Sequence, residues 1–206
     1  MEVTALCIHI LISEFALLST TSAQSFSAQK PDFPVVSPDQ LQFFEYSSSI
    51  SISCPMDKHL NTWRVMRKLY NMSPANNSEV YCIPAPSCTM ETFGKHSGEY
   101  WCENDEGERS HALNILITDG PVILKFTARP VKEGSDVILH CINKNKEQRT
   151  RISDFYKDGQ FFRTNYEEGL TLHNVSKSDE GFYKCNIPGV GDSAESWLAV
   201  KPGNGK

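Results

Sequence analysis

Two short segments decide the fold: residues 97–102 read SGEYWC, and residues 179–185 read DEGFYKC. Each segment places a Tyr two positions before a Cys, and each has a partner Cys upstream, at Cys54 and Cys141. A Tyr at that spacing is typical of the corner that precedes the F strand of an immunoglobulin sandwich. The sequence therefore predicts an all-β protein of two tandem constant-like (C2-type) immunoglobulin β-sandwich domains.

Alternating apolar residues support the same interpretation. Residues 50–54 (ISISC) place Ile50, Ile52 and Cys54 on one face of a strand, and Trp63 follows at the distance of the core Trp that packs on the inter-sheet disulfide. In the second unit Phe155 stands where that Trp would be. The paired cysteines are 48 and 44 residues apart, which is short for a variable-type domain and favours seven-strand sandwiches.

The cysteine count indicates an oxidising compartment. Seven cysteines occur, and Cys7 lies in the apolar N-terminal stretch, which leaves six in the mature chain. Six cysteines allow fifteen pairings. Spacing favours the following three disulfides: Cys54–Cys102, Cys141–Cys185 and, from the remaining two, Cys82–Cys88. A zinc site at the last pair is the alternative, although no further Cys or His pair with ligand spacing lies nearby.

The N-terminal stretch predicts secretion. Residues 1–23 contain an apolar run and end in Ser22 and Ala23, which suit signal peptidase cleavage. The run lacks an early Lys or Arg and contains Glu14, so an uncleaved anchor is the alternative, but the run is too interrupted to span a bilayer comfortably.

The mature chain divides into two domains and a tail. We expect the signal peptide at 1–23, domain 1 at 24–118, domain 2 at 119–202 and a C-terminal tail at 203–206. The brief turn at 118–121 predicts a fairly fixed angle between the domains. No later hydrophobic stretch follows, so we expect an extracellular protein or the ectodomain of a cell-surface receptor.

Three sequons predict surface glycans on the mature chain. They begin at Asn71, Asn76 and Asn174. The first two fall in the long connection between strands C and E of domain 1, where glycans would keep that edge free of protein contacts.

The sequence favours binding over catalysis. No nucleophile motif, metal-ligand spacing or phosphate-binding loop occurs, so we expect no enzyme activity, no metal and no cofactor. The formal charge of −5 becomes −3 without residues 1–23, and no strong basic stripe predicts nucleic acid. Alternation sends Trp101 outward, where it is either covered by another strand's side chain or part of an interface.

Several longer phrases resemble one family. They are QFFEY at 42–46, WRVMR at 63–67, GEYWCE at 98–103, DGPVIL at 119–124, FYKDG at 155–159, VSKSDEGFYKC at 175–185 and ESWLAV at 195–200. These phrases resemble the first two domains of bony-fish Fc receptors and Fc receptor-like proteins over essentially the whole mature chain. The Cys82–Cys88 pair is similar to an additional domain 1 disulfide of the fish branch.

The resemblance implies binding to the Fc region of an immunoglobulin, mainly through the B–C loop, C–C′ region and F–G loop of domain 2. On this sequence those regions supply Lys144, Lys146, Arg149, Arg151, Tyr156, Lys157, Gln160, Phe161, Ile187, Pro188, Gly189, Val190 and Gly191. The mammalian B–C loop carries a Trp that helps to clamp an Fc proline. This B–C loop has no aromatic residue, so the same clamp is not expected.

Together these features predict a secreted Fc receptor-like protein that acts as a soluble modulator or decoy of antibody–receptor signalling. The alternative is a receptor or adhesion ectodomain that recognises a non-immunoglobulin cell-surface protein. The basic B–C loop at 144–151 is a partner contact in the first interpretation and an ordinary solvated loop otherwise.

Overall fold

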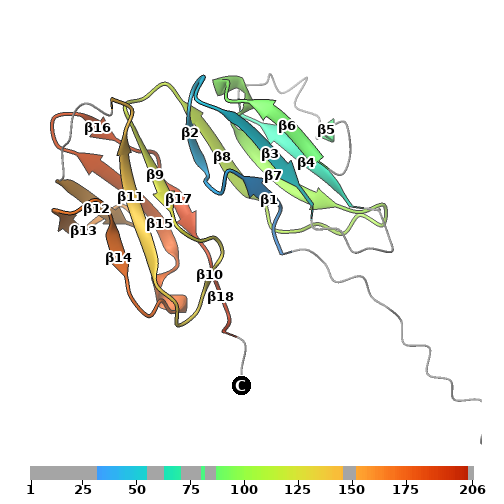
Figure 1. Ribbon diagram of the computed structural model, residues 1–206. Coiled ribbons are helices and arrows are strands. Elements are labelled where there is room, and N and C mark those ends of the chain that lie inside the picture. The colour runs from blue at the N-terminus through green and yellow to red at the C-terminus, as the bar shows by residue number, and fades with distance from the viewer. Residues whose placement is uncertain (1–31, 55–62, 71–79, 82–86, 146–151, 204–206) are drawn as a thin grey trace, which may run out of the picture.

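Two β-sandwiches in series make up the chain (Figure 1). The computed structural model describes residues 32–54, 63–70, 80–81, 87–145 and 152–203. We call the sandwich formed by β1 to β8 domain 1 and the sandwich formed by β9 to β18 domain 2. Their hydrophobic cores are separate, and the first ends at Ile117 while the second begins at Val122.

Domain 1 consists of eight strands and one short 3-10 helix among its described residues. They are β1 (Val35–Ser37), β2 (Gln42–Phe44), β3 (Ser49–Ser53), β4 (Arg64–Leu69), β5 (Val80–Tyr81), β6 (Ser87–Glu91), η1 (Gly94–His96), β7 (Gly98–Glu103) and β8 (Leu113–Thr118). One sheet has the order β1-β3-β6, and the other has the order β2-β8-β7-β4-β5.

Domain 2 repeats this plan. Its elements are β9 (Val122–Phe126), β10 (Val131–Lys132), β11 (Val137–Asn143), β12 (Ser153–Lys157), β13 (Gln160–Asn165), β14 (Leu170–Leu172), η2 (Lys177–Asp179), β15 (Gly181–Ile187), β16 (Gly191–Asp192), β17 (Ser196–Leu198) and β18 (Val200–Lys201). One sheet has the order β14-β11-β9, the other runs β13-β12-β15-β16 with β17 also on β15, and β10 pairs with β18.

The strand order confirms the predicted fold class. The C strand is β4 in domain 1 and β12 in domain 2. The strand that follows it, β5 or β13, pairs with it and so joins the sheet that holds the F strand (β7 or β15) and the G strand (β8 or β17). It does not pair with the E strand, β6 or β14, in the described residues. This placement distinguishes the C2-type immunoglobulin sandwich from the constant type, in which the fourth strand borders strand E.

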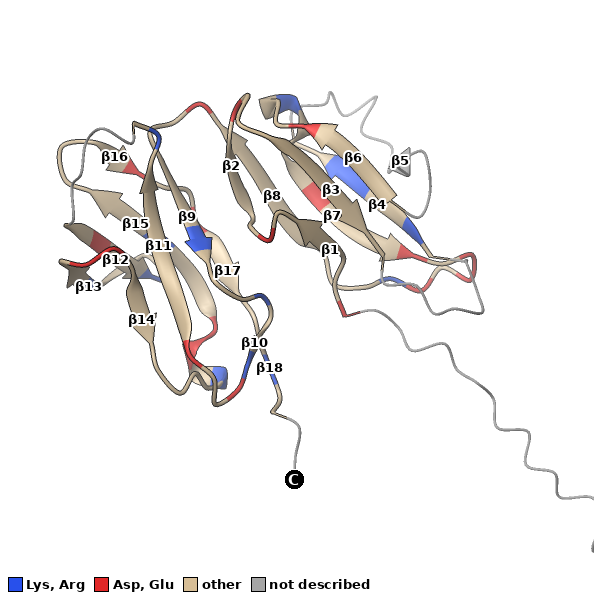
Figure 2. Cartoon of the chain, in the orientation of Figure 1, with Lys and Arg blue, Asp and Glu red and all other residues tan. Residues whose placement is uncertain are grey.

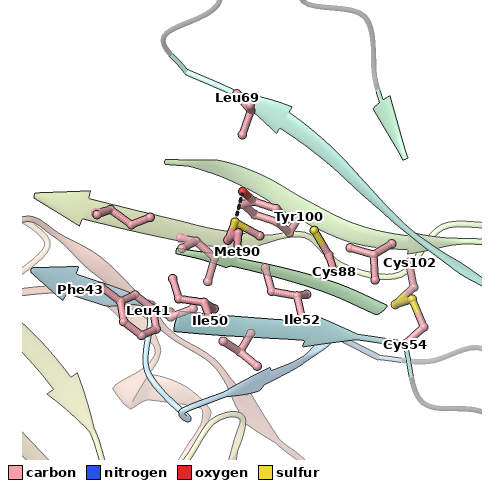
Figure 3. Close-up of a cluster of buried hydrophobic side chains, with 14 of the residues drawn as sticks. Leu41, Phe43, Ile50, Ile52, Cys54, Leu69, Cys88, Met90, Tyr100 and Cys102 are labelled. Atoms are coloured by element: carbon pink, nitrogen blue, oxygen red, sulfur yellow. Dashed lines mark hydrogen bonds between the residues drawn. A yellow bond between two sulfur atoms is a disulfide. The ribbon is translucent and has the colours of Figure 1, made fainter. Parts of the chain in front are cut away.

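Both predicted inter-sheet disulfides are present. The Cα atoms of Cys54 and Cys102 are 5.8 Å apart, and those of Cys141 and Cys185 are 5.9 Å apart. Figure 3 shows the first of these beside the apolar side chains of domain 1. Cys88 is also disulfide-bonded, but Cys82 lies outside the described residues, so the predicted Cys82–Cys88 pair stays a prediction.

The core positions predicted by alternation and by the place of the core Trp are confirmed. Ile50, Ile52 and Phe155 are completely buried, and Trp63 is 6% exposed within the domain 1 core. β1, which lies between two prolines, is an edge strand that pairs only with β3 among the described strands. The proline-rich lead-in therefore forms the edge strand that its composition allows.

The tyrosine corner of domain 2 matches the sequence prediction. The Tyr183 hydroxyl donates to the Asp179 carbonyl oxygen at 2.8 Å. The Asp179 carboxylate accepts hydrogen bonds from the backbone N–H and the hydroxyl of Ser176, at 2.8 and 3.0 Å. These bonds form a capping box around η2 and hold the turn that leads into β15.

Domain 1 holds the same corner with a different carboxylate. The Tyr100 hydroxyl donates to the His96 carbonyl oxygen at 2.7 Å, as predicted. His96 stands at the position that Asp179 occupies in domain 2. Glu45 supplies a carboxylate instead, and its Oε1 accepts a hydrogen bond from the Gly94 N–H at 2.7 Å. A side chain at Gly94 would collide with this carboxylate, since a Cβ there would lie 2.3 Å from Oε1.

One buried side chain joins the two domains. Gln42 on β2 is 0% exposed, and its Nε2 donates to the Ala194 carbonyl oxygen and the Ser196 Oγ, both at 2.8 Å. Its Oε1 accepts from the Leu124 N–H at 2.9 Å. A strand of domain 1 is therefore hydrogen-bonded to β9 and to the segment that leads into β17 in domain 2.

An ion pair between a buried guanidinium and an exposed carboxylate supports this junction. The Arg129 guanidinium of domain 2 is bonded to the Asp39 carboxylate of domain 1, and the Arg129 side chain is only 9% exposed. Burial lowers the pKa of Arg129, and the neighbouring Asp39 opposes that shift.

Among the described residues, no helix has the length and apolar character needed to cross a membrane.

The two tyrosine corners predict a loss of stability at alkaline pH. Burial raises the pKa of Tyr100 to about 12, and burial together with Asp179 and Asp158 raises the pKa of Tyr183 above its usual range. The folded state holds these protons more tightly than the unfolded chain, whose Tyr pKa is about 10. The free energy of unfolding should thus be unaffected below about pH 10 and should fall as pH rises through about 10 to 12.

Urea denaturation at a series of alkaline pH values measures this effect. The Tyr100→Phe and Tyr183→Phe variants should each lose about 1 kcal/mol at neutral pH, because a buried hydrogen bond is removed, and should show a shallower decline above pH 10. An equal decline in the double variant would show that other groups cause it.

Candidate protein-binding site

Lys144 of the predicted B–C loop site lies at the domain junction. Its backbone N–H donates to the Pro121 carbonyl oxygen at 2.8 Å, and its Nζ lies 3.3 Å from the Asp119 carbonyl oxygen. The same Nζ lies 5.9 Å from the centroid of the Phe44 ring in domain 1. The ammonium therefore contacts the interdomain link and β2 within the molecule itself.

Of the residues predicted in the F–G loop of domain 2, only the two at the tip are exposed. Ile187 is 2% exposed and belongs to the hydrophobic core, so its side chain cannot contact a partner in this structure. Val190 is partly buried against that core, and Gly191 approaches Pro121 so closely that a Cβ would lie 2.9 Å from it. Pro188 and Gly189 are exposed, with Gly189 at φ +77° in the turn.

Some predicted positions lie outside the described residues. These are Lys146, Arg149 and Arg151 of the B–C loop, together with the sequon residues Asn71 and Asn76. The third sequon residue, Asn174, is exposed and follows β14, so glycosylation there remains a prediction that its exposure allows.

The outer face of the larger sheet in domain 2 brings two predicted residues together. Tyr156 on β12 is directly opposite Phe161 on β13, and their ring centroids are 5.9 Å apart in an edge-to-face arrangement. We call these two residues the β12–β13 aromatic pair. Phe161 is 61% exposed, and the Nζ of Lys184 on β15 lies 5.1 Å from the centroid of the Tyr156 ring. Aromatic side chains with an adjacent cation are enriched at protein interfaces.

The remaining predicted residues, Lys157 and Gln160, lie at the opposite end of this sheet from the F–G loop. Lys157 pairs with Gln160 across the β12–β13 turn and with Tyr183 on β15. The Lys157 Nζ donates to the Ser178 carbonyl oxygen at 2.6 Å and lies 5.7 Å from the centroid of the Tyr183 ring. It therefore braces the tyrosine corner, while Gln160 is exposed in the turn.

The sequence interpretation missed a second aromatic pair on the same sheet. Phe182 on β15 and Trp197 on β17 are cross-strand neighbours with ring centroids 5.0 Å apart, and they are 46% and 42% exposed. We call them the β15–β17 aromatic pair. Part of the signal was available, because Tyr183 lies two positions before the inter-sheet Cys185 and shares its inward face, and alternation then sends Phe182 outward.

Trp101 is covered, which decides between the two interpretations of its outward direction. It is 5% exposed and lies opposite Met66 on β4. The Arg109 guanidinium lies 5.2 Å from the centroid of the Trp101 ring, and the indole N–H donates to Glu103 at 3.1 Å. Arg109 and Glu103 form a salt bridge at 2.7 Å, so Trp101 is packed within domain 1 and is not a free interface residue.

The described residues contain no cluster of metal-ligand side chains, and neither sign of charge dominates the view of Figure 2. Within those residues, no group of three or more His, Cys, Asp or Glu side chains is arranged to hold a metal ion. In the view of Figure 2, acidic and basic residues are interspersed over both domains.

Comparisons with known proteins identify receptor-type relatives at low identity. Mouse Fc receptor-like protein 5 is 33% identical over 90 residues, which cover 43% of this chain and 15% of that protein. Human Fc receptor-like protein 3 is also 33% identical over 90 residues, with 43% and 12% covered. The alpha subunit of the mouse high affinity immunoglobulin epsilon receptor is 21% identical over 183 residues, which cover 87% of this chain and 66% of that protein.

The chain thus spans less than a sixth of the two Fc receptor-like relatives and about two thirds of the epsilon receptor subunit. No family model matches the chain. Among solved structures, murine CEACAM1b has a TM-score of 0.34 and 14% identity, with 82% of this chain and 99% of that chain covered. A marsupial T cell receptor has a TM-score of 0.33 and 14% identity, with 84% and 74% covered. The sequence similarities support an immunoglobulin-type receptor ectodomain.

The packing of Trp101 predicts a structural role for this residue. Trp101→Ala should lower the free energy of unfolding by about 3–5 kcal/mol, because it removes a buried ring from the sheet. Trp197→Ala should cost about 1 kcal/mol or less, because that ring is 42% exposed. Thermal and urea denaturation of the two variants provide the comparison, and equal stabilities would contradict the packing described for Trp101.

Proposed function

We propose that this chain is an Fc receptor-like ectodomain that binds the Fc region of an immunoglobulin, mainly through domain 2. The similarity to Fc receptor-like proteins 3 and 5 and to the epsilon receptor subunit supports this proposal. The structural observation that carries it is the β12–β13 aromatic pair, Tyr156 and Phe161, which stands beside Lys184 on an open sheet face of domain 2.

The rigid setting of this pair suits protein recognition. Both residues lie on regular strands, so their side chains are held in place before a partner arrives, and less conformational entropy is lost on binding. Lys184 also lies 3.7 Å from Asp192, which holds its ammonium over the Tyr156 ring. The exposed tip of the F–G loop, Pro188 and Gly189, adds a second contact at the end of the sheet near domain 1.

The B–C loop completes the proposed surface only in part. Lys144 contacts the domain junction and is not proposed as a partner contact. The other basic positions of this loop, Lys146, Arg149 and Arg151, stay predicted partner contacts and lie outside the described residues. A secreted form would bind antibody without transmitting a signal of its own, so we propose a modulatory or decoy role. The second candidate, an ectodomain for a non-immunoglobulin surface protein, would use the same exposed pair.

Binding to immobilised immunoglobulin classes of the same species tests the proposal. The full chain should bind at least one Fc fragment saturably, and the Tyr156→Ala/Phe161→Ala variant should bind at least tenfold more weakly, because interface aromatics carry a large share of binding energy. Trp197→Ala is the matched control, since it removes an exposed aromatic from the same sheet and should leave Fc binding unchanged.

Two results would contradict the proposal. If no Fc fragment of any class binds saturably, the non-immunoglobulin receptor becomes the better interpretation. If the aromatic double variant binds as well as the unmodified chain, the Fc surface lies elsewhere on the molecule.

A further inference from the structure

A cleft of about 650 Å³ lies between the two domains and is separate from the β12–β13 aromatic pair. Domain 1 contributes the lead-in to β1, β1 itself and the start of β8. Domain 2 contributes the Arg129–Pro130 segment, Phe182, and residues of and around β17. The size is that of cavities that bind a few side chains or a small ligand.

Exposed apolar side chains face each other across this cleft. The β15–β17 aromatic pair, Phe182 and Trp197, forms the domain 2 wall, and Phe33, Val35 and Leu113 line the domain 1 wall. Val35 is 54% exposed, and the two aromatic residues are also nearly half exposed. Large apolar side chains exposed on both walls of one cleft indicate a site for an apolar partner.

The charges around the cleft are predominantly negative. Its lining holds the carboxylates of Asp32, Asp39, Glu99 and Glu195 and only two cations. One cation, Arg129, is neutralised by its ion pair with Asp39, and the other is Lys201. No salt bridge among the described residues involves Asp32, Glu99 or Glu195. These three carboxylates, together with the face of the Trp197 ring, attract a cationic partner.

The strands that border the cleft favour an extended partner. β1 pairs only with β3, and β17 pairs only with β15, among the described strands. Each strand thus has one edge without a ladder partner in that part of the chain. Peptides that bind proteins in an extended conformation often lie along such edges, with alternate side chains in apolar contact.

The junction holds both walls in place. Gln42 hydrogen-bonds domain 1 to Ala194 and Ser196, which lie three positions and one position before Trp197 along the chain. Arg129, which lines the cleft, is bonded to Asp39 on the opposite wall. A cleft with fixed walls needs little rearrangement to accept a ligand.

We infer that this interdomain cleft binds an extended segment of a partner protein in which Arg or Lys alternates with apolar residues. The apolar side chains contact Phe182, Trp197 and Val35, and the cations lie over the Trp197 ring and beside Glu99 and Glu195. This inference does not rest on the proposed function, because the cleft lining includes neither the β12–β13 aromatic pair nor the exposed loop tip, Pro188 and Gly189.

A fluorescein-labelled peptide in which Val and Arg alternate is the probe, and a peptide in which Glu replaces Arg is its control. Fluorescence anisotropy with the full chain should show saturable binding of the Arg peptide and at least tenfold weaker binding of the Glu peptide. All three tryptophans are described, and Trp63 and Trp101 are buried while Trp197 is 42% exposed. Acrylamide quenching therefore reports on Trp197, and the unlabelled Arg peptide should reduce it.

Two variants and one control locate the site. Trp197→Ala and, separately, Glu99→Gln/Glu195→Gln should each weaken binding of the Arg peptide at least fivefold; the second variant retains the apolar packing. Phe161→Ala removes an aromatic residue that does not line the cleft, and it should leave the affinity unchanged.

Several outcomes would overturn the inference. Equal binding of the Arg and Glu peptides would remove the role of the carboxylates, and equal affinities of all variants would place the peptide elsewhere. Trp197 could also resist acrylamide quenching in the free protein. If dilution then makes it quenchable, a second copy of the chain fills the cleft. If removal of the residues before Asp32 makes it quenchable, the chain's own N-terminal segment fills the cleft.

Discussion

The arrangement of the two domains depends on the buried amide of Gln42. A primary amide completely removed from water is costly unless its hydrogen bonds are made, and an unsatisfied buried polar group costs about 1–3 kcal/mol. Here the amide makes three hydrogen bonds, all to domain 2. They can form together only when β2 lies beside β9 and the start of β17, so one side chain selects one relative position of the sandwiches.

That position determines what each surface of domain 2 can do. Domain 1 packs at β9, which brings Phe44 near Lys144, while within domain 2 the F–G loop lies against Pro121. The β17 side of the larger sheet in domain 2 faces domain 1 and forms one wall of a cleft, while the β13 side remains open. One sheet therefore carries two aromatic pairs in different settings: Phe182 and Trp197 at the cleft, and Tyr156 and Phe161 on the open face.

Much of the fold could be predicted because its determinants are local. The spacing of Tyr and Cys fixes the tyrosine corners and the inter-sheet disulfides. Two-residue alternation identifies Ile50 and Ile52 as core, and the position of the core Trp identifies Phe155. β2 could not be predicted in this way, since three residues are too few for a periodic pattern. The role of Gln42 depends on partners 82 to 154 residues away, and no local pattern indicates them.

The candidate site was predicted less completely for the same reason. Whether an outward side chain is free depends on what other strands place over it. Trp101 is covered by Arg109, which approaches from beyond the end of β7, whereas Trp197 remains exposed. Ile187 belongs to the predicted loop but continues the inward alternation of β15 and is buried. The corner of domain 1 shows the converse case, where Glu45 replaces a carboxylate that the local sequence lacks.

The most direct test of this account is the relative orientation of the domains in solution, measured by backbone residual dipolar couplings. A single alignment tensor should fit both domains of the unmodified chain and of the Gln40→Ala control. Gln42→Ala should require a separate tensor for each domain. The account would be contradicted if the unmodified chain needed two tensors, or if Gln42→Ala were still described by one.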